Sequence, residues 1–356
     1  MAYYNPSDKY YILVKEDDYG VYEPIETPEV NQRLYPIIPG DGFNMSVNPQ
    51  QNLIETNVGR GYPFLANNAG IPEVTGTLTC LVDDGANDSA SSGTNVQNAK
   101  HLIEWGAGES DVPNLTDLPS WSIVVGEATE SVDEELFLGV KATSMTLASS
   151  SDPGGQRLTA SYDLVARRAY YGAECVENTA MTDYPDEADG ALANYPTTSG
   201  YYHTQGVLTM GLAGSTAVNA RVMDFSLTFT NTMDMGLGTG TSMEWCTMMG
   251  RQVTCDLTIE YDDPKYRNAF LGYAPTGGSS GSSVTAPANC ELSMKYGTAG
   301  SSPATQLVLD LKSQIIVTAF EPINSLNTRS RANISFIARV GTSGGAFTPD
   351  FSFTLA

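Results

Sequence analysis

A strand-like phrase occurs twice in the chain. Residues 74–84 read VTGTLTCLVDD and residues 253–263 read VTCDLTIEYDD, so 6 of 11 positions match at an offset of 179 (253 against 74). The chain has 356 residues, and the offset is close to half of that length. A phrase repeated at half the chain length predicts two copies of one structural module.

The segments around this phrase also correspond. In both halves the predicted order is strand, long loop, strand, short helix and three further strands. The matching segments are 43–47 and 225–229, helices 98–106 and 265–272, and strands 121–125 and 290–296, 136–147 and 306–320, 157–168 and 331–340. The agreement in order favours an internal duplication over chance similarity between two Thr-rich strands.

Local composition predicts an all-β protein with short helices. Short runs of Val, Ile, Thr, Tyr and Phe are separated by Gly, Asn, Asp and Ser, which is typical of strands and turns. We expect an extended, proline-rich N-terminal segment 1–40, a first domain 41–168, a polar connector 169–206 and a second domain 207–356. A chain of this length can bury a core without disulfides or metal.

The formal net charge of −23 limits which kinds of molecule the protein is expected to bind. An acidic surface repels phosphates, which argues against a protein that binds nucleic acid or an anionic membrane. Solubility and a salty habitat are alternative explanations of the acidity. No apolar run approaches the roughly 18 residues of a membrane span, and residues 1–18 lack the apolar core of a signal peptide.

The cysteines and histidines suggest no chemistry. The 5 cysteines lack paired spacing, so a disulfide framework is not expected and a reducing interior fits. His101 stands on the polar side of a predicted helix and His203 in the connector, and both are expected to be surface residues without partners. No HExxH, CxxC or zinc-type Cys/His spacing occurs.

Other candidate motifs also read as loops. Residues 277–281 (GGSSG) fit G-x-S-x-G, but a Ser/Gly run cannot hold the strand–turn–helix of a nucleophile elbow. Residues 236–242 (GLGTGTS) lack the P-loop lysine. The acidic stretches 83–88 and 183–190 lack the last carboxylate of an EF-hand. We therefore expect no enzyme, no cofactor and no metal.

The order of these segments resembles the tail tube proteins of long-tailed, siphovirus-like bacteriophages, in the version with two tandem tube domains per chain. The likeness covers nearly the whole chain. It rests on G-x-x-x-V-T-G-x-L-T at 70–79, LPSWSIVVG at 118–126, the glycine-containing strand 136–147 and FSLTFTN at 225–231. The insertion 85–97 and the connector 169–206 depart from the usual pattern.

The resemblance implies a small β-sandwich or barrel domain with a helix on its flank, present twice. Six such domains in a ring would form a continuous inner barrel, and stacked rings a hollow tube that carries DNA from capsid to host. Two domains per chain then imply a homotrimer with pseudo-sixfold symmetry. The implied partners are further copies of the chain, the tape measure protein, the tail terminator and distal tail proteins. The implied location is the virion tail, after assembly in the host cytoplasm.

The resemblance also suggests which residues meet the next ring. In the family, a loop corresponding to 48–73 and 230–252 reaches the adjacent ring, and methionine-rich loops make adaptable contacts. An ordinary mobile hairpin is the alternative. The candidate inter-ring contacts are Asn57, Arg60, Tyr62, Phe64, Met233, Met235, Met243, Trp245 and Met248.

Part of the acidity is expected to face the lumen, because an acidic wall lets DNA slide whereas a basic wall would hold it. Asp83, Asp84, Asp262 and Asp263 stand at equivalent places in the two copies and are candidates for an acidic surface or lumen.

Three other functions fit less of the sequence. The inner tube of a contractile injection system shares the fold, and a surrounding sheath would identify it. A receptor-binding or carbohydrate-binding β-sandwich is allowed by the aromatic loop 198–206. A glycosidase would need a fixed pair of carboxylates, and no pattern fixes one.

Overall fold

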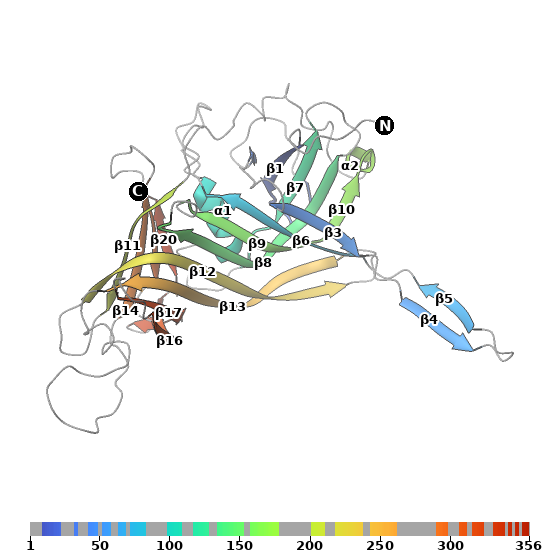
Figure 1. The fold of residues 1–356 in the computed structure, drawn as a ribbon. Coiled ribbons are helices and arrows are strands. Elements are labelled where there is room, and N and C mark those ends of the chain that lie inside the picture. The colour runs from blue at the N-terminus through green and yellow to red at the C-terminus, as the bar shows by residue number, and fades with distance from the viewer. Residues whose placement is uncertain are drawn as a thin grey trace.

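The computed structural model confirms the all-β class. It describes residues 9–22, 32–34, 42–48, 52–57, 63–68, 72–82, 98–108, 117–127, 134–152, 157–177, 201–210, 218–237, 243–261, 290–297, 306–311, 315–323, 330–338, 341–343, 346–348 and 351–355. Within these ranges the regular elements are strands apart from α1 (Asn98–Ala107) and the single turn α2 (Glu174–Glu177). Figure 1 shows the strands as one curved body from which a separate hairpin projects.

Eight antiparallel strands lie side by side and run through both halves of the chain. We call this row the main sheet, and its order is β3-β6-β9-β8-β12-β13-β17-β16. Its strands are β3 (Phe43–Asn48), β6 (Glu73–Leu81), β9 (Thr159–Ala166), β8 (Glu135–Ser150), β12 (Val218–Leu237), β13 (Met243–Glu260), β17 (Arg331–Ala338) and β16 (Ile315–Ile323). The row is therefore continuous across the boundary between the halves, where β8 pairs with β12.

Each half carries further strands that continue from the main sheet. In the first half the order is β2-β1-β7-β8-β10, and in the second it is β12-β11-β14-β15-β20. These strands are β1 (Lys9–Lys15), β2 (Gln32–Leu34), β7 (Trp121–Glu127), β10 (Arg168–Tyr171), β11 (Tyr202–Met210), β14 (Cys290–Gly297), β15 (Gln306–Leu311) and β20 (Ser352–Leu355). The N-terminal segment thus contributes β1, which lies between β2 and β7.

Strand register is the same in the two halves. Across the first half the paired residues are Phe43, Leu78, Tyr162 and Met145, and across the second they are Phe225, Leu257, Ile334 and Phe320. Leu78 and Leu257 are the matching leucines of the repeated phrase. Segments 43–47 and 225–229, which were matched in the sequence, thus pair at equivalent positions with the two copies of the repeated phrase.

A β-bulge also recurs at the same place. Register shifts between Ala142 and Ser144 in β8, and between Val317 and Ala319 in β16. The residue in each bulge is a threonine, and its Oγ1 donates to a carbonyl of the neighbouring strand: Thr143 to Asp163 O at 3.1 Å and Thr318 to Ser335 O at 3.0 Å. Such bulges bend and twist a strand.

One predicted strand is wrong. Residues 306–320 form two strands, β15 and β16, whereas the matching segment is the single strand β8. Strands β7 and β14 are the matched segments 121–125 and 290–296, and we align Trp121 with Leu292. Trp121 pairs with Val140 and Leu292 with Leu311, so Leu311 corresponds to Val140. Lys141 follows Val140 directly, but its counterpart Ile316 comes five residues beyond Leu311, which leaves four extra residues in the second half. These extra residues separate the two parts of the strand.

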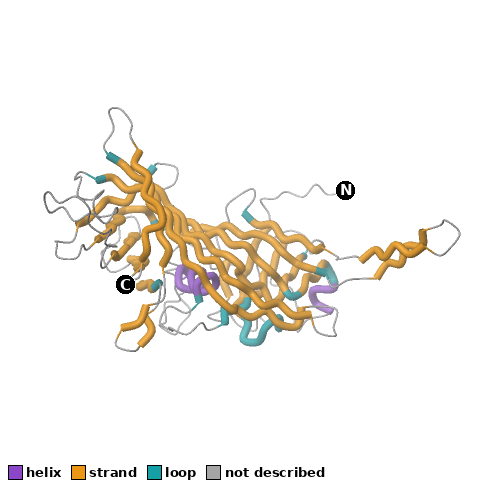
Figure 2. The backbone as a smooth tube through the Cα atoms, turned by 90° about the horizontal axis from the view of Figure 1, so that it is seen from below, coloured by secondary structure: helices purple, strands orange, loops and turns teal. Residues whose placement is uncertain are grey.

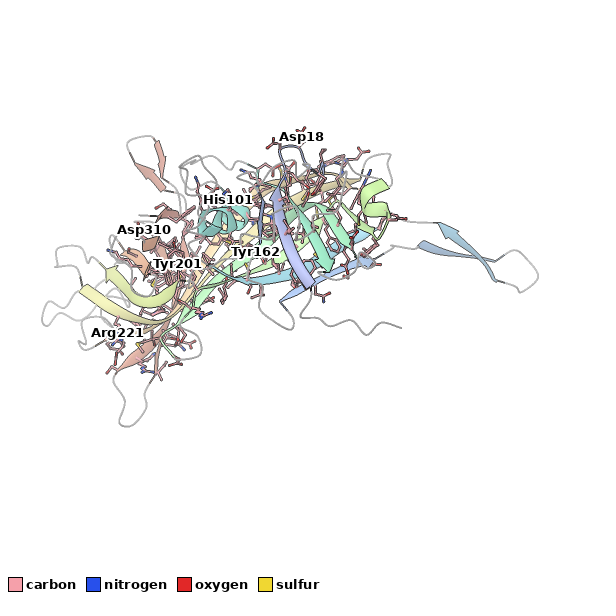
Figure 3. All side chains as sticks on the ribbon, turned by 90° about the horizontal axis from the view of Figure 1, so that it is seen from above. Asp18, His101, Tyr162, Tyr201, Arg221 and Asp310 are labelled. Carbon is pink, nitrogen blue, oxygen red and sulfur yellow. The ribbon has the colours of Figure 1, made fainter. Side chains whose placement is uncertain are left out.

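Helix α1 closes the core of the first half. Leu102, Ile103 and Trp105, expected to form its apolar side, are buried. Trp105 Nε1 donates to Val140 O at 3.2 Å, its ring lies 4.9 Å from that of Tyr162, and Tyr162 OH donates to Leu102 O at 2.8 Å. Figure 3 labels His101 on α1 and Tyr162 in the neighbouring sheet. The matching helix predicted at 265–272 lies outside the described residues.

Two short hairpins complete the described chain. Strands β18 (Gly341–Ser343) and β19 (Ala346–Thr348) pair with each other. Strands β4 (Asn52–Asn57) and β5 (Pro63–Asn68) do the same and are a separate two-stranded sheet. The β4–β5 hairpin, which follows β3 in the chain, stands away from the body (Figures 1 and 2).

Candidate functional site: the polar face of the main sheet and the β12–β13 hairpin

The main sheet has one apolar and one polar face. Side chains alternate along each strand, so residues two apart share a face. In β6, Val74, Leu78 and Cys80 are buried in the core, while Thr75, Thr77 and Thr79 point to the other side. The same alternation holds in β13 and β17. The second face is rich in Thr and Ser, which form strands readily and keep the surface wet.

Carboxylates outnumber cations on the polar face. Among its described residues the acidic ones are Glu73, Asp163, Asp224, Asp256, Glu260 and Glu321. The exposed basic ones are Arg221 and Arg331, and Arg221 lies 3.9 Å from Glu260. The face is therefore acidic, and its lysine, Lys141, is buried.

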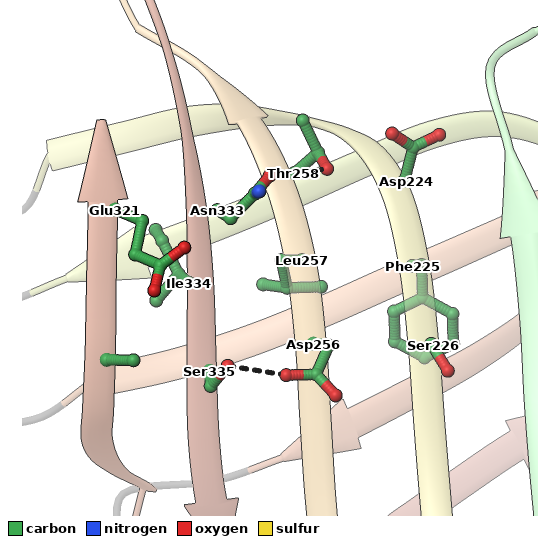
Figure 4. A pocket seen from close by; sticks show the side chains of 11 residues that line it. Asp224, Phe225, Ser226, Asp256, Leu257, Thr258, Glu321, Asn333, Ile334 and Ser335 are labelled. Atoms are coloured by element: carbon green, nitrogen blue, oxygen red, sulfur yellow. Dashed lines mark hydrogen bonds between the residues drawn. The ribbon is translucent and has the colours of Figure 1, made fainter. Parts of the chain in front are cut away.

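A shallow hollow of about 430 Å³ lies on this face in the second half. Asp224, Asp256 and Glu321 line it from three different strands (Figure 4). Ser335 Oγ donates to Asp256 Oδ1 at 2.5 Å, and Ser150 Oγ to Asp224 Oδ1 at 2.5 Å. These hydroxyl donors fix the carboxylates without neutralising them, so the negative charge stays at the surface.

The joint between β8 and β12 holds the two halves together. Residues 224–230 pair with residues 144–150. Met145, Leu147, Leu227 and Phe229 are fully buried there. On the polar face, Thr146 Oγ1 and Thr228 Oγ1 are 3.1 Å apart. The joint thus has an apolar side that faces the core and a hydrogen-bonded side that faces solvent.

The expectation that His203 is a surface residue without partners is wrong. His203 Nε2 donates to Val222 O at 3.2 Å, and its Nδ1 lies 3.0 Å from Ser149 Oγ. Ser149 is buried and also bonds Tyr296 OH at 2.8 Å. Burial lowers the pKa of His203, and the bond to Val222 O offsets this only in part. The Ser149 hydroxyl bonds both His203 and Tyr296, so the trio is a structural link between β8, β11 and β14. Sequence spacing gave no signal for it.

A long hairpin from the second half lies on the first half. We call residues 230–250, where β12 and β13 pair beyond the joint, the docked hairpin. Lys141 Nζ donates to Cys246 O at 2.6 Å and to Asp117 Oδ2 at 2.7 Å, and Arg167 Nε donates to Met243 O at 3.0 Å. Met248 N donates to Asp117 Oδ1 at 3.0 Å. Charged side chains of the first half therefore hold the hairpin by hydrogen bonds to its backbone at several points.

The docked hairpin divides the candidate contact residues between two faces. Met243 and Met248 are buried, and Met233 packs beside Val165 and Cys246. Burial raises the pKa of the Cys246 thiol to about 11, despite the opposing effect of Lys141. The other face exposes Trp245, with 45% of its surface accessible. Met249, at a register shift, is exposed as well, whereas Met235, opposite Cys246, is an exposed residue on the docked side. The Trp245 ring lies against Gly236, where a side chain would collide with it.

The remaining candidates are only partly placed. Asn57 ends β4 and Phe64 lies in β5, so both belong to the projecting hairpin. Arg60, Tyr62, Asp83, Asp84, Asp262 and Asp263 lie outside the described residues.

The site has the character of a structural surface. In the described part of the chain, no three His, Cys, Asp or Glu side chains are grouped so that they could hold a metal ion. No helix in that part is both long and apolar enough to cross a membrane. Cys80, Cys175, Cys246 and Cys255 are buried thiols rather than disulfides. The described chain is thus an all-β protein with one long antiparallel sheet that has an apolar and a polar face.

Comparison with known families agrees with this class. The family model described as phage tail tube protein matches residues 7–338. The chain therefore belongs to the phage tail tube protein family, whose members are structural components of the virion tail that associate into a tube. No curated protein matches the chain in sequence.

Proposed function

We propose that three copies of this chain close into a ring, and that stacked rings form the tail tube of a long-tailed bacteriophage. The tube assembles in the host cytoplasm with the tape measure, terminator and distal tail proteins, and DNA passes through it to the host. Each chain supplies two tandem domains that arose by duplication. The equal registers and the bulges at Thr143 and Thr318 support this origin.

The observation that carries the proposal is that the two edge strands of the main sheet are the counterparts of the two strands that pair at the internal joint. The main sheet ends at β3 on one side and β16 on the other. Register makes β3 the counterpart of β12, and β16 the counterpart of β8. Because β8 pairs with β12 inside the chain, β16 of one chain can pair with β3 of the next in the same way. Closure removes exposed edges that would otherwise aggregate.

The joint also predicts the register between chains. Inside the chain Met145 lies opposite Phe229, which is four residues beyond Phe225. Phe320 is the counterpart of Met145, so it should lie opposite Val47, four residues beyond Phe43. Val47 is 37% exposed and Phe320 is half-buried, whereas Met145 and Phe229 are fully buried. Ring closure would bury both edge residues in the same manner.

The same register fixes the shape of the barrel. A shift of four residues across four strands corresponds to a strand tilt of about 35°, within the range found in closed barrels. Three chains with eight strands each then give a barrel about 45 Å across at the backbone and a lumen of about 35 Å. Two chains would leave about 20 Å, which a hydrated duplex would fill. Three chains supply the six domains that the resemblance implies.

The polar face of the main sheet would line this lumen. Its carboxylates, among them Asp163, Asp256 and Glu321, repel the phosphates of a passing duplex. The repulsion acts over about 8 Å at physiological salt, so it keeps DNA from adhering without blocking it. Asp256→Lys with Glu321→Lys should slow genome ejection while tubes still assemble.

Ring stacking would use the exposed face of the docked hairpin. Trp245 and Met249 are apolar side chains that no described part of the chain covers. Aromatic and methionine side chains are enriched in protein interfaces. The internal face of the same hairpin is already occupied by contacts with Lys141 and Arg167.

Disulfide crosslinking tests the proposed joint. Ser46 and Glu321 are the counterparts of Thr228 and Thr146, whose Oγ1 atoms are 3.1 Å apart. Ser46→Cys with Glu321→Cys should therefore give intermolecular disulfides that end at a closed trimer. The matched control, Ser46→Cys with Ala319→Cys, places the thiols one diagonal step apart, about 7–8 Å, beyond disulfide reach. Equal crosslinking of both pairs, or none, would contradict the register. Isolated tubes that carry a contractile sheath would assign the chain to an injection system instead.

A further inference from the structure

Equivalent positions on the polar face of the main sheet are buried in the first half and more exposed in the second. Lys141 and Val165 face each other in the first half, and both are 3% exposed because the docked hairpin covers them. Their counterparts in the second half are Ile316 and Ile337, which also face each other. Ile316 is 44% exposed and Ile337 is half-buried.

Nothing in the described part of the chain covers this isoleucine pair. Two adjacent isoleucines are unusual on a polar sheet face that is exposed to solvent. Contiguous exposed apolar surface instead marks a site of contact with another segment or protein. The first half shows what such a position requires, because there the β12–β13 connection folds over it.

The first half has a hairpin that does not pack on the described body of the chain. The docked hairpin connects β12 and β13, and the β4–β5 hairpin occurs at the corresponding place between β3 and β6. Strands β4 and β5 pair only with each other and stand away from the body (Figure 2). Among the described residues, the second half therefore has an apolar surface that no segment covers, and the first half has a hairpin that packs on no other element.

The geometry points to one arrangement that joins these two features: the β4–β5 hairpin of each chain lies over Ile316 and Ile337 of the neighbouring chain in the ring. This inference rests on the proposed ring, in which β3 pairs with the neighbour's β16. Inside the chain, β12 pairs with β8, and the hairpin that continues from β12 reaches Lys141 and Val165. Between chains, β3 would pair with the neighbour's β16 in the same way. The β4–β5 hairpin, which follows β3, would then reach the neighbour's Ile316 and Ile337.

The composition of the hairpin fits an apolar target. Ile54 faces Ala66 and Thr56 faces Phe64 in the register, so these four positions share one face of the hairpin. Ile316 stands at the position that Lys141 has in the first half. An isoleucine cannot donate a hydrogen bond to a backbone carbonyl as Lys141 does to Cys246 O. The contact between chains would thus depend on apolar burial, whereas the internal contact also uses hydrogen bonds from charged side chains to the backbone of the hairpin.

Thiol accessibility tests the inference. In Ile316→Cys chains, maleimide labelling of Cys at position 316 should slow about tenfold or more when tubes assemble, because burial limits access. A second variant also replaces residues 50–70 by a short Gly-Ser turn. Its assembled tubes should label position 316 as fast as the unassembled chain. Asp18→Cys is the matched control, since Asp18 is exposed outside the main sheet (Figure 3) and should label equally in all states.

The outcomes separate the inference from the proposal beneath it. Tubes in which position 316 labels at the free-chain rate overturn the hairpin contact and leave the ring intact. Slow labelling that persists without the hairpin also overturns it, because another segment must then cover the site. Chains that remain monomeric under assembly conditions, seen by electron microscopy, overturn both.

Discussion

Lys141 is the residue on which docking of the β12–β13 hairpin should depend most. Its ammonium group is buried and donates to Cys246 O at 2.6 Å and to Asp117 Oδ2 at 2.7 Å. Lys141→Met keeps the length of the side chain but removes both bonds. Asp117 is half exposed and can return to water, so loss of that ion pair costs little.

The cost comes chiefly from the Cys246 carbonyl. A hydrogen bond to a charged donor contributes about 1.5–3 kcal/mol, and a buried acceptor left alone costs about 1–3 kcal/mol. These figures overlap, so we expect Lys141→Met to destabilise the docked hairpin by about 2–4 kcal/mol. If the hairpin opens locally, amide exchange at Met243–Met248 should speed up about 30- to 900-fold, since 1.36 kcal/mol is a factor of ten.

Hydrogen exchange followed by mass spectrometry measures this directly. Lys100→Met is the matched control, because Lys100 is exposed and lies 3.7 Å from Glu104 in a surface pair that should contribute little. Unchanged protection of Met243–Met248 in Lys141→Met would refute the role of Lys141. So would a loss spread evenly over the core strands, because the hairpin would then not be a separate unit.

Two further predictions concern the joint and the exposed hairpin face. Because burial lowers the folded-state pKa of His203 below its ordinary 6.5, the unfolded chain takes up the proton first, and stability present above pH 6.5 should fall as the pH drops through the folded pKa. His203→Gln, which retains a donor and an acceptor, should lose that part of the pH dependence in melting curves, and an unchanged slope would contradict it. Trp245→Ala should leave the melting temperature within about 2 °C, since the side chain is half exposed, yet strongly reduce tube length in micrographs. Tubes of normal length would rule out Trp245 as a stacking contact.

The sequence predicted the strands of the main sheet well because their alternation is regular. The repeated phrase placed β6 and β13, and Phe43 and Phe225 marked the neighbouring strands that pair with them. The apolar side of α1 followed from Leu102, Ile103 and Trp105 in the same way. Local periodicity reports which face is buried, and this part of the fold depends on little else.

Contacts between distant segments could not be read in this way. The bonds from Lys141 to Cys246 O and from His203 to Val222 O join residues by backbone carbonyls, which carry no side-chain signal. Met233, Met235, Met243 and Met248 were all candidates for a contact surface, but Met243 and Met248 are buried while Met235 is exposed. The sequence showed the strands of this hairpin without showing which face the first half would cover.

Helical reconstruction of assembled tubes by electron cryo-microscopy tests the central claim most directly. The expected result is a ring of three chains in which β16 of each chain pairs antiparallel with β3 of the next, with Phe320 opposite Val47. A ring in which these edges are unpaired, or paired in another register, would contradict the claim that the internal joint between β8 and β12 is repeated between chains.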